Sequence, residues 1–131
     1  FWSNEPVRTL VLKSRDVLAP YRSPNANGIP DALRDAEGYW TGFSARIRVI
    51  AYNTKLVKPE EAPASVFDLA NPKWKGQVAM ADPRFGSTSF HVAALYAHAG
   101  DSRMDDLFQR LKANGVRVVD SNSTVRDLSL I

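Results

Sequence analysis

Hydroxyl and amide side chains gather at three points of this sequence, each just before a run of apolar residues. The three stretches are Ser3-Asn4-Glu5, Gly86-Ser87-Thr88-Ser89 and Ser121-Asn122-Ser123-Thr124. Each is expected to open a helix, because Ser, Thr and Asn favour helix N-termini. A helix start offers unpaired backbone N–H groups and the positive end of the helix dipole, which suit an anion. The same residues also cap helices for stability alone, and both interpretations stay open.

Two arginines, Arg46 and Arg48, alternate within a segment rich in β-branched and aromatic residues. In a strand this spacing places both side chains on the same side. Like charges that face one way in an apolar segment need partners, which are either an anionic ligand or nearby carboxylates. The sequence is equally compatible with both.

Catalytic and metal chemistry have less support in this sequence. His91 and His98 would lie about 10.5 Å apart along a helix, too far for two nitrogens that each bind one ion at about 2 Å. Ser87 and His91 are four residues apart, but no Gly-x-Ser-x-Gly elbow surrounds Ser87, so hydrolysis is the weakest hypothesis. The absence of cysteine excludes thiol catalysis and zinc–thiolate sites. The protein is therefore expected to be no enzyme and to carry no cofactor.

The composition is that of an ordinary globular protein, with 131 residues, of which 44% are hydrophobic and 24% charged. The 17 Lys and Arg residues are scattered among 14 Asp and Glu residues, so no basic stripe predicts nucleic-acid binding. The apolar stretches are shorter than the roughly 20 residues of a membrane-spanning helix. Because the chain opens on Phe1-Trp2 and ends on an apolar helical pattern, we interpret it as an internal fragment.

The elements that must position the polar stretches alternate between helices and strands. Helices are predicted from Asn4 to about Arg15, from the Ser87 region to Gly100, from Asp101 to Gly115 and after Asp120. Strands are predicted over 39–54, as one long strand or two, and over 77–81 and 116–119. Residues 19–38 should form a loop with a helical turn at 31–34, and another turn is expected at 65–69. The alternation indicates an α/β fold with a largely parallel sheet, whose ligands bind at the carboxyl ends of the strands.

Several blocks of the sequence together carry a family resemblance. They are Phe1 to Glu5, Tyr39 to Thr54, the turn Asn71-Pro72-Lys73-Trp74-Lys75-Gly76 and the pair Asn122-Ser123. In their order and spacing they resemble the ferric-ion-type periplasmic solute-binding proteins of ABC importers. The pattern Asn-Pro-x-Trp-x-Gly, one short strand before a polar helix start, is fairly specific in that context.

The resemblance implies a partial type II periplasmic-binding-protein fold, in which two lobes with mostly parallel sheets are flanked by helices. Residues 1–43 would form part of the first lobe, 44–54 an inter-lobe crossover strand and 55–131 most of the second lobe. It also implies a periplasmic or extracytoplasmic protein, with a signal peptide in the full-length precursor. Such a protein captures a small molecule or ion in the cleft between its lobes and delivers it to an ABC permease in the membrane.

The resemblance also implies a ligand site. In iron-binding members a carboxylate matching Asn4 is a metal ligand, while a basic residue matching Arg46 and the helix start matching 87–89 hold a synergistic anion. A tyrosine pair beyond Ile131 and a histidine before Phe1 complete that iron site. Asn4 is a neutral amide, with Glu5 beside it, whereas ferric iron prefers anionic oxygens, so the ligand is either ferric iron with its anion or an anionic solute. The predicted ligand-binding residues are Ser3, Asn4, Glu5, Arg46, Gly86, Ser87, Thr88, Ser89, Asn122 and Ser123.

Two further expectations complete the predictions. The alternative function is the effector-sensing domain of a transcription regulator, because that class uses the same fold, and an upstream helix-turn-helix would favour it. An incomplete sheet would also expose unpaired strand edges, which invite pairing with another chain. Either flanking residues beyond this sequence or self-association through these edges is therefore expected.

Overall fold

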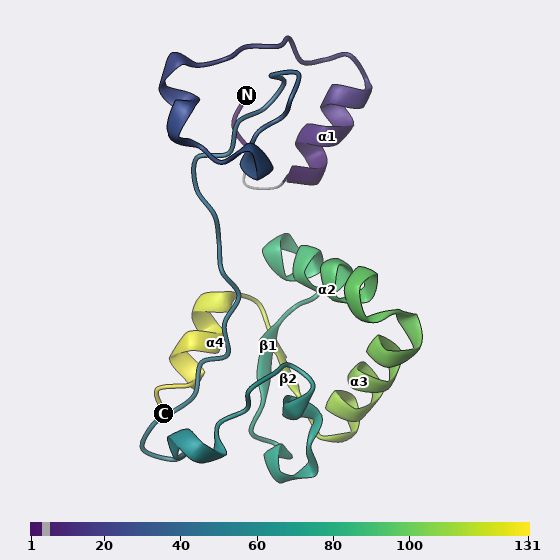
Figure 1. Cartoon of the computed structure of the whole chain (residues 1–131). Coiled ribbons are helices and arrows are strands. Elements are labelled where there is room, and N and C mark those ends of the chain that lie inside the picture. Colours follow the sequence, from purple (N-terminus) through teal and green to yellow (C-terminus); the bar gives the residue numbers. More distant parts are fainter. Residues whose placement is uncertain (4–5) are drawn as a thin grey trace. The chain divides into compact units, whose positions relative to one another are not determined.

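The computed structural model describes residues 1–3 and 6–131, which fall into two compact units, Phe1–Ile47 and Arg48–Ile131. Figure 1 shows the helix of the first unit and the helices and strands of the second. Asn4 and Glu5, two of the predicted ligand-binding residues, lie outside the described residues.

The first unit contains the α-helix α1 (Pro6–Ser14) and two short 3-10 helices, Pro24–Gly28 and Asp31–Leu33. The predicted first helix and the loop with a helical turn near 31–34 are thereby confirmed. Pro6 suits the first turn of α1, because a residue there has no intrahelical acceptor for an N–H.

A salt-bridge cluster holds the loop of the first unit to α1. Lys13 Nζ lies 2.7 Å from Asp35 Oδ1 and 2.7 Å from Glu37 Oε2. The hydrogen bond from Lys13, assisted by the backbone N–H of Tyr39, lowers the pKa of Asp35 against the opposing effect of its burial. Lys13 also lies 4.9 Å from the centre of the Tyr39 ring, so one ammonium group contacts three side chains within residues 35–39.

The strand predicted over 39–54 is wrong for the described structure. Only one isolated antiparallel bridge forms there, between Arg34 and Thr41, and Gly42 N–H donates to Leu33 O at 2.8 Å. Residues 43–52 have no backbone hydrogen bond to any described residue. β-branched and aromatic residues favour a strand only when a neighbouring strand pairs with it, and no described segment does so here.

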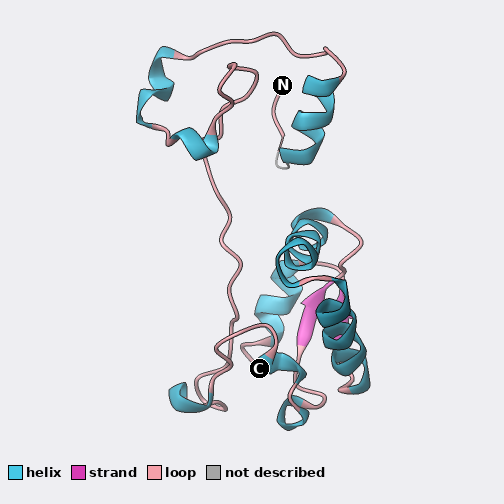
Figure 2. Cartoon of the chain, turned by 45° about the vertical axis from the view of Figure 1, so that its right-hand side comes forward, coloured by secondary structure: helices cyan, strands magenta, loops and turns pink. Residues whose placement is uncertain are grey.

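The second unit is built on two parallel strands, β1 (Ala79–Ala81) and β2 (Arg117–Val119), with Ala79 opposite Arg117. Its α-helices are α2 (Gly86–Ala99), α3 (Asp101–Ala113) and α4 (Asn122–Leu128). The chain runs β1–α2–α3–β2–α4, which confirms the predicted α/β fold with a parallel sheet (Figure 2). α4 packs against both strands. None of the described helices has the length and apolarity needed to cross a bilayer.

The segment of the second unit before β1 contains three short 3-10 helices and no described α-helix or strand. They are Pro59–Glu61, Asp68–Ala70 and Pro72–Trp74. The turn predicted over 65–69 is therefore present but begins later, at Asp68. Asp68 Oδ2 accepts the N–H groups of Ala64 and Ser65 and ties this turn to the residues before it.

The helix starts differ by one or two residues from their predicted caps. Phe85 is the N-cap of α2, so the hydroxyls predicted as caps lie in its first turn. Gly100, with φ of 84°, ends α2 and is also the N-cap of α3, which makes Asp101 the first helical residue. Ser121 caps α4, because its Oγ accepts the N–H of Thr124 at 3.1 Å.

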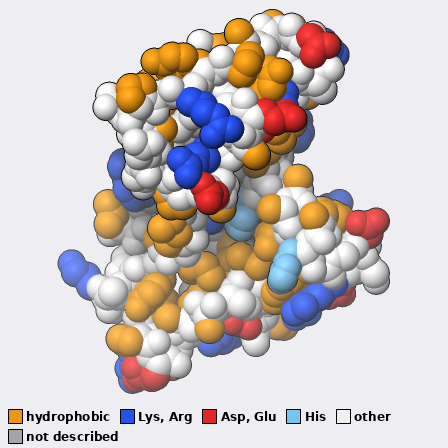
Figure 3. Space-filling model, turned by 45° about the horizontal axis from the view of Figure 1, so that its top comes forward, with side chains coloured by type: hydrophobic (Ala, Val, Ile, Leu, Met, Phe, Trp, Pro, Cys, Tyr) orange, Lys and Arg blue, Asp and Glu red, His pale blue; other side chains and the backbone are white. Residues whose placement is uncertain are grey.

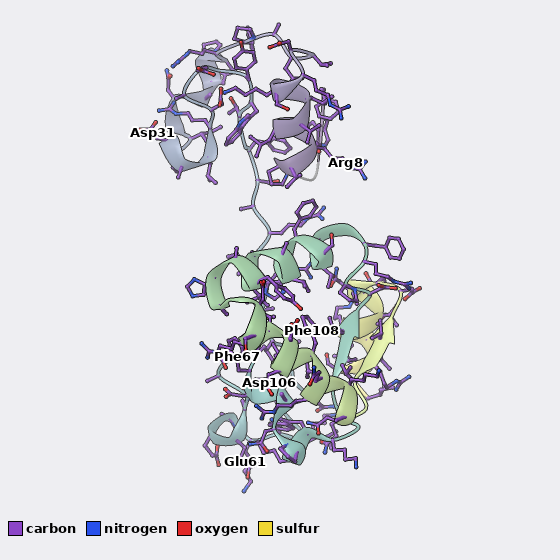
Figure 4. All side chains as sticks on the ribbon, turned by 90° about the vertical axis from the view of Figure 1, so that its right-hand side faces the viewer. Arg8, Asp31, Glu61, Phe67, Asp106 and Phe108 are labelled. Atoms are coloured by element: carbon purple, nitrogen blue, oxygen red, sulfur yellow. The ribbon has the colours of Figure 1, made fainter. Side chains whose placement is uncertain are left out.

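The core of the second unit lies where α3 meets the 3-10 helix Asp68–Ala70. Met104 is fully buried, and Leu107 and Leu111 follow it at helical spacing against Ala70. Phe108, labelled in Figure 4, also lies on α3. It stacks on Tyr96 of α2 with 6.2 Å between ring centres. These contacts make α2, α3 and the preceding segment one packed unit.

The end of α3 is joined to the Asn-Pro-x-Trp-x-Gly turn by one side chain. Buried Asn114 donates through Nδ2 to Ala70 O at 3.1 Å and to Asn71 O at 3.0 Å. Its own carbonyl accepts the N–H of Gly76 at 2.8 Å. Asn114 thus holds both ends of the turn, since Asn71 begins it and Gly76 ends it.

Candidate anion-binding site

The guanidinium group of Arg48 joins the first turns of two helices of the second unit. Its Nη1 donates to Asn122 Oδ1 at the start of α4, at 2.7 Å. Its Nη2 donates to Ser87 Oγ and, at 3.5 Å, to Thr88 Oγ1 in the first turn of α2. A planar guanidinium suits this arrangement, because its donors point in fixed directions that a flexible ammonium group lacks.

The positive charge of Arg48 is not balanced by a carboxylate. Its acceptors are two hydroxyls and one amide, and it forms no ion pair with any residue that the structure describes. The side chain is half-buried, so water screens its charge only in part. The positive ends of α2 and α4 lie at the same place. A guanidinium and two helix starts together favour a bound anion.

The hydroxyls in the first turn of α2 have different roles. Thr88 is buried, with 7% of its surface exposed, and contacts Arg48 together with Ser87. Ser89 instead donates through Oγ to the carbonyl of Gly86 at 2.7 Å. Gly86 has φ of 55°, a left-handed conformation that favours glycine at this entry to the helix.

The Arg48 side chain also lines two cavities of the second unit. The larger, of about 470 Å³, is bordered by Thr88, His91 and Asn122 near Arg48 and by mostly apolar side chains elsewhere. The smaller, of about 430 Å³, lies between residues 48–50, residues 63–66 and His91. Burial and then the charge of Arg48 lower the pKa of His91.

The structure brings together three of the predicted ligand-binding residues, Ser87, Thr88 and Asn122, around Arg48. Gly86 and Ser89 belong to the same first turn, and Ser123 is exposed in α4. Ser3 and Arg46 belong to the first unit, Ser3 half-buried and Arg46 exposed. The ligand role of all of these residues remains a prediction.

Arg48, the centre of this candidate site, is a residue that the sequence alone did not distinguish from Arg46. The alternation of Arg46 and Arg48 predicts partners for both, and the family resemblance favours Arg46. The structure instead places Arg48 against the start of α2. Period-two spacing could not decide between the two arginines, because in a strand both would point to the same side, and residues 43–53 are not a strand.

The profile of the family of bacterial extracellular solute-binding proteins matches residues 10–128. The chain belongs to this family. The match confirms the family resemblance and the expected extracytoplasmic class, and this family is one of solute-binding proteins rather than of enzymes. It does not favour the transcription-regulator alternative.

Similar proteins support the same fold and class. The chain is 35% identical over 98 residues to "Iron uptake protein A1" of Synechocystis sp., covering 75% of this chain and 27% of that protein. It is 30% identical over 122 residues to the "Fe(3+)-binding periplasmic protein" of Serratia marcescens, covering 93% and 35%. The crystal structure of iron-bound HitA from Pseudomonas aeruginosa matches with a TM-score of 0.84 and 28% identity, over 97% of this chain and 41% of HitA. The chain thus spans about a third of the curated relatives' length, and the match to HitA confirms a partial periplasmic-binding fold.

Metal ligands do not cluster among the described residues. No group of three His, Asp or Glu side chains in residues 1–3 and 6–131 is placed to hold a metal ion. The groups gathered at the described site are one guanidinium group, two hydroxyls and an amide.

Proposed function

We propose that this protein is the solute-binding component of an ABC importer, and that its second unit holds the synergistic anion of a ferric-iron site. Arg48, Ser87, Thr88 and Asn122 would bind that anion. The observation that carries the proposal is the Arg48 guanidinium, held between two helix starts without a carboxylate partner. The printed names of the relatives from Synechocystis and Serratia, and the iron-bound state of HitA, support iron as the cargo.

An anion at Arg48 would connect the described site to iron chemistry. Ferric iron is a hard cation that prefers anionic oxygen ligands. An oxyanion held by a guanidinium group and helix N–H groups keeps further oxygens free to bind a metal. Binding of a simple anionic solute at the same residues is the other outcome that the experiment below distinguishes.

The proposal extends to the lobes and to the partner in the membrane. Residues 1–43 would belong to the first lobe, 44–54 would cross between lobes without forming a strand here, and 55–131 would belong to the second lobe. Closure of the lobes on the cargo would create the form that docks on a membrane permease. Self-association through the outer edges of β1 and β2 stays a prediction, which light scattering would check.

The test is native mass spectrometry of the full-length protein loaded with ferric iron in phosphate buffer. We expect one iron and one phosphate in the wild type. Arg48→Ala should lose the phosphate mass and bind phosphate about tenfold to a hundredfold more weakly in calorimetry, because it loses charge-assisted hydrogen bonds. Arg126→Ala is the matched control, since Arg126 is an exposed arginine of α4 paired with its neighbour Asp127.

Three outcomes would decide between the proposals. If the wild type binds phosphate without iron, the cargo is an anionic solute rather than iron. Phosphate retained by Arg48→Ala would remove Arg48 from the site. An equal loss in Arg126→Ala would mean that overall charge, rather than the Arg48 site, governs binding.

A further inference from the structure

His91 lies beside Arg48 but is not used by the site described so far. It follows Ser87 by four residues on α2, so both side chains lie on the same face of the helix, one turn apart. His91 and Arg48 line both cavities of the second unit. The imidazole nitrogens of His91 hydrogen-bond to none of the described residues. They are therefore available to a ligand.

The described side chains around His91 include cations but no anions. No Asp or Glu side chain among the described residues lines either cavity, and the wall formed by residues 63–66 has no ionisable side chain. The other ionisable groups that border the larger cavity are Tyr52 and Arg117. On α2 itself the ionisable neighbours are His98 and Tyr96, and Tyr96 donates to Asp105 of α3 at 2.7 Å.

We propose that His91 is a second, protonation-dependent cationic group of this anion site, so that the site takes up a proton together with its anion. The inference rests on the proposed function and adds the regulation and ligand class of the same site. In the free protein, burial and the nearby guanidinium keep the pKa of His91 low. An anion bound between the two groups cancels the repulsion from Arg48 and attracts the imidazolium.

Thermodynamic linkage determines whether the affinity for the anion rises or falls with pH. If the anion favours protonation of His91, protonation must favour the anion to the same extent. Affinity therefore rises as pH falls, by at most about tenfold per pH unit for one linked proton. A guanidinium and an imidazolium side by side match a small oxyanion with two negative charges.

The experiment is isothermal titration calorimetry of the full-length protein with sulfate and, separately, oxalate. Both probes keep a fixed charge over the range tested, so any change in affinity comes from the protein. Between about pH 7.5 and about pH 5.5 we expect the wild-type Kd of at least one probe to fall roughly tenfold. Titrations at one pH in two buffers of different ionisation enthalpy should show net proton uptake per anion bound.

Variants separate a role in binding from a role in folding. His91→Gln should bind with a pH-independent Kd and no proton uptake. His91→Lys should bind tightly at both pH values, because its charge is permanent in this range. His98→Gln is the matched control, since His98 is exposed on the same helix, and it should behave as the wild type.

The outcomes distinguish this inference from the proposed function. Anion binding that depends on Arg48 but shows the same pH slope in His91→Gln as in the wild type would overturn the inference and leave the proposed function standing. Zero proton uptake by the wild type on anion binding would likewise overturn the inference and leave the proposed function standing. Failure of both probes to bind wild-type protein at either pH would overturn the anion site itself, and with it the role of His91.

Discussion

Arg48 Nη1 donates to Asn122 Oδ1 at 2.7 Å, a contact between residues that lie 74 positions apart in the sequence. The acceptor is a neutral amide, so the contact positions the guanidinium group without neutralising it. A carboxylate at the same position would orient Arg48 equally well but would also occupy its charge. An amide in place of a carboxylate therefore leaves the guanidinium charge without a counter-ion at this contact, as the proposed anion site requires.

The first prediction follows from this contact. Asn122→Asp should give Arg48 an internal counter-ion that competes with the ligand, because aspartate has nearly the shape of asparagine. We expect anion affinity to fall at least about tenfold, more than in Asn122→Ala, which removes only a neutral acceptor. Calorimetric titration with sulfate measures the difference.

The control for this prediction is the neighbouring residue on α4. Ser123→Asp adds the same charge one position away, at an exposed side chain. A large loss of affinity in Asn122→Asp and a small one in Ser123→Asp would locate the effect in the contact with Arg48. Equal losses would contradict it.

The second prediction concerns Asp82, which follows β1. The side chain of Arg84, and then its backbone N–H at 2.9 Å, lower the pKa of Asp82 to about 2. Because this value lies below that of an unfolded aspartate, about 3.9, the carboxylate stabilises the fold above that pH and loses its effect as pH falls toward 2.

NMR titration of the Asp82 carboxyl carbon measures this value directly. In Arg84→Ala the pKa should rise only part of the way to the ordinary value, since the backbone N–H of residue 84 still donates. Arg126→Ala, which removes a distant arginine of the same unit, should leave it near 2. An unchanged titration in Arg84→Ala would show that the guanidinium has no part in the shift.

The third prediction concerns the core. Met104 is the largest fully buried side chain described, and truncation would leave a cavity between α3 and the segment that contains Ala70. Met104→Ala should lower the free energy of unfolding by about 2–5 kcal/mol in urea denaturation. Leu56→Ala, at a side chain that is 73% exposed, should change it by less than about 0.5 kcal/mol. Similar losses in both variants would contradict this account of the core.

Local sequence signals predicted the helical half of the fold well. Gly100 and Gly115 both have positive φ and lie where α2 and α3 were expected to end. Such signals work because a helix satisfies its hydrogen bonds within one segment. The prediction failed over 39–54, since a strand depends on a partner that its own residues do not specify.

The candidate site could be predicted only in part for the same reason. Ser87 and Asn122 were identified because helix starts are recognisable from polar residues before an apolar run. Ser87 and Asn122 both contact Arg48. This contact depends on the tertiary structure, which a local sequence pattern does not predict. The spacing of Arg46 and Arg48 assumed a strand and therefore made the two equivalent.

The fourth prediction concerns Asn114 at the end of α3. Asn114→Ala would remove one hydrogen bond from each of the carbonyls of Ala70 and Asn71, which keep Arg110 Nη2 and the N–H of Trp74 as donors, and should cost about 0.5–1.5 kcal/mol of unfolding free energy. Asn114→Asp should cost more at neutral pH, because a carboxylate would face two carbonyl oxygens. The extra cost should shrink as pH falls and the new carboxyl becomes a donor. Equal stability of the two variants at every pH would rule out this role of the amide.

The hydrogen bonds of Asn114 also indicate the structural role of the Asn-Pro-x-Trp-x-Gly signature. Asn71 O and Gly76 N–H, at the two ends of the signature, are both occupied by Asn114. The Asn71 side chain is occupied as well, since it accepts the N–H of Lys73. These groups serve the scaffold, while Trp74 and Gly76 of the signature also border the larger cavity. If the residues around Arg48 bind the ligand as proposed, a genome search with the signature would collect scaffolds of this kind, whereas a search on the residues around Arg48 would sort them by cargo.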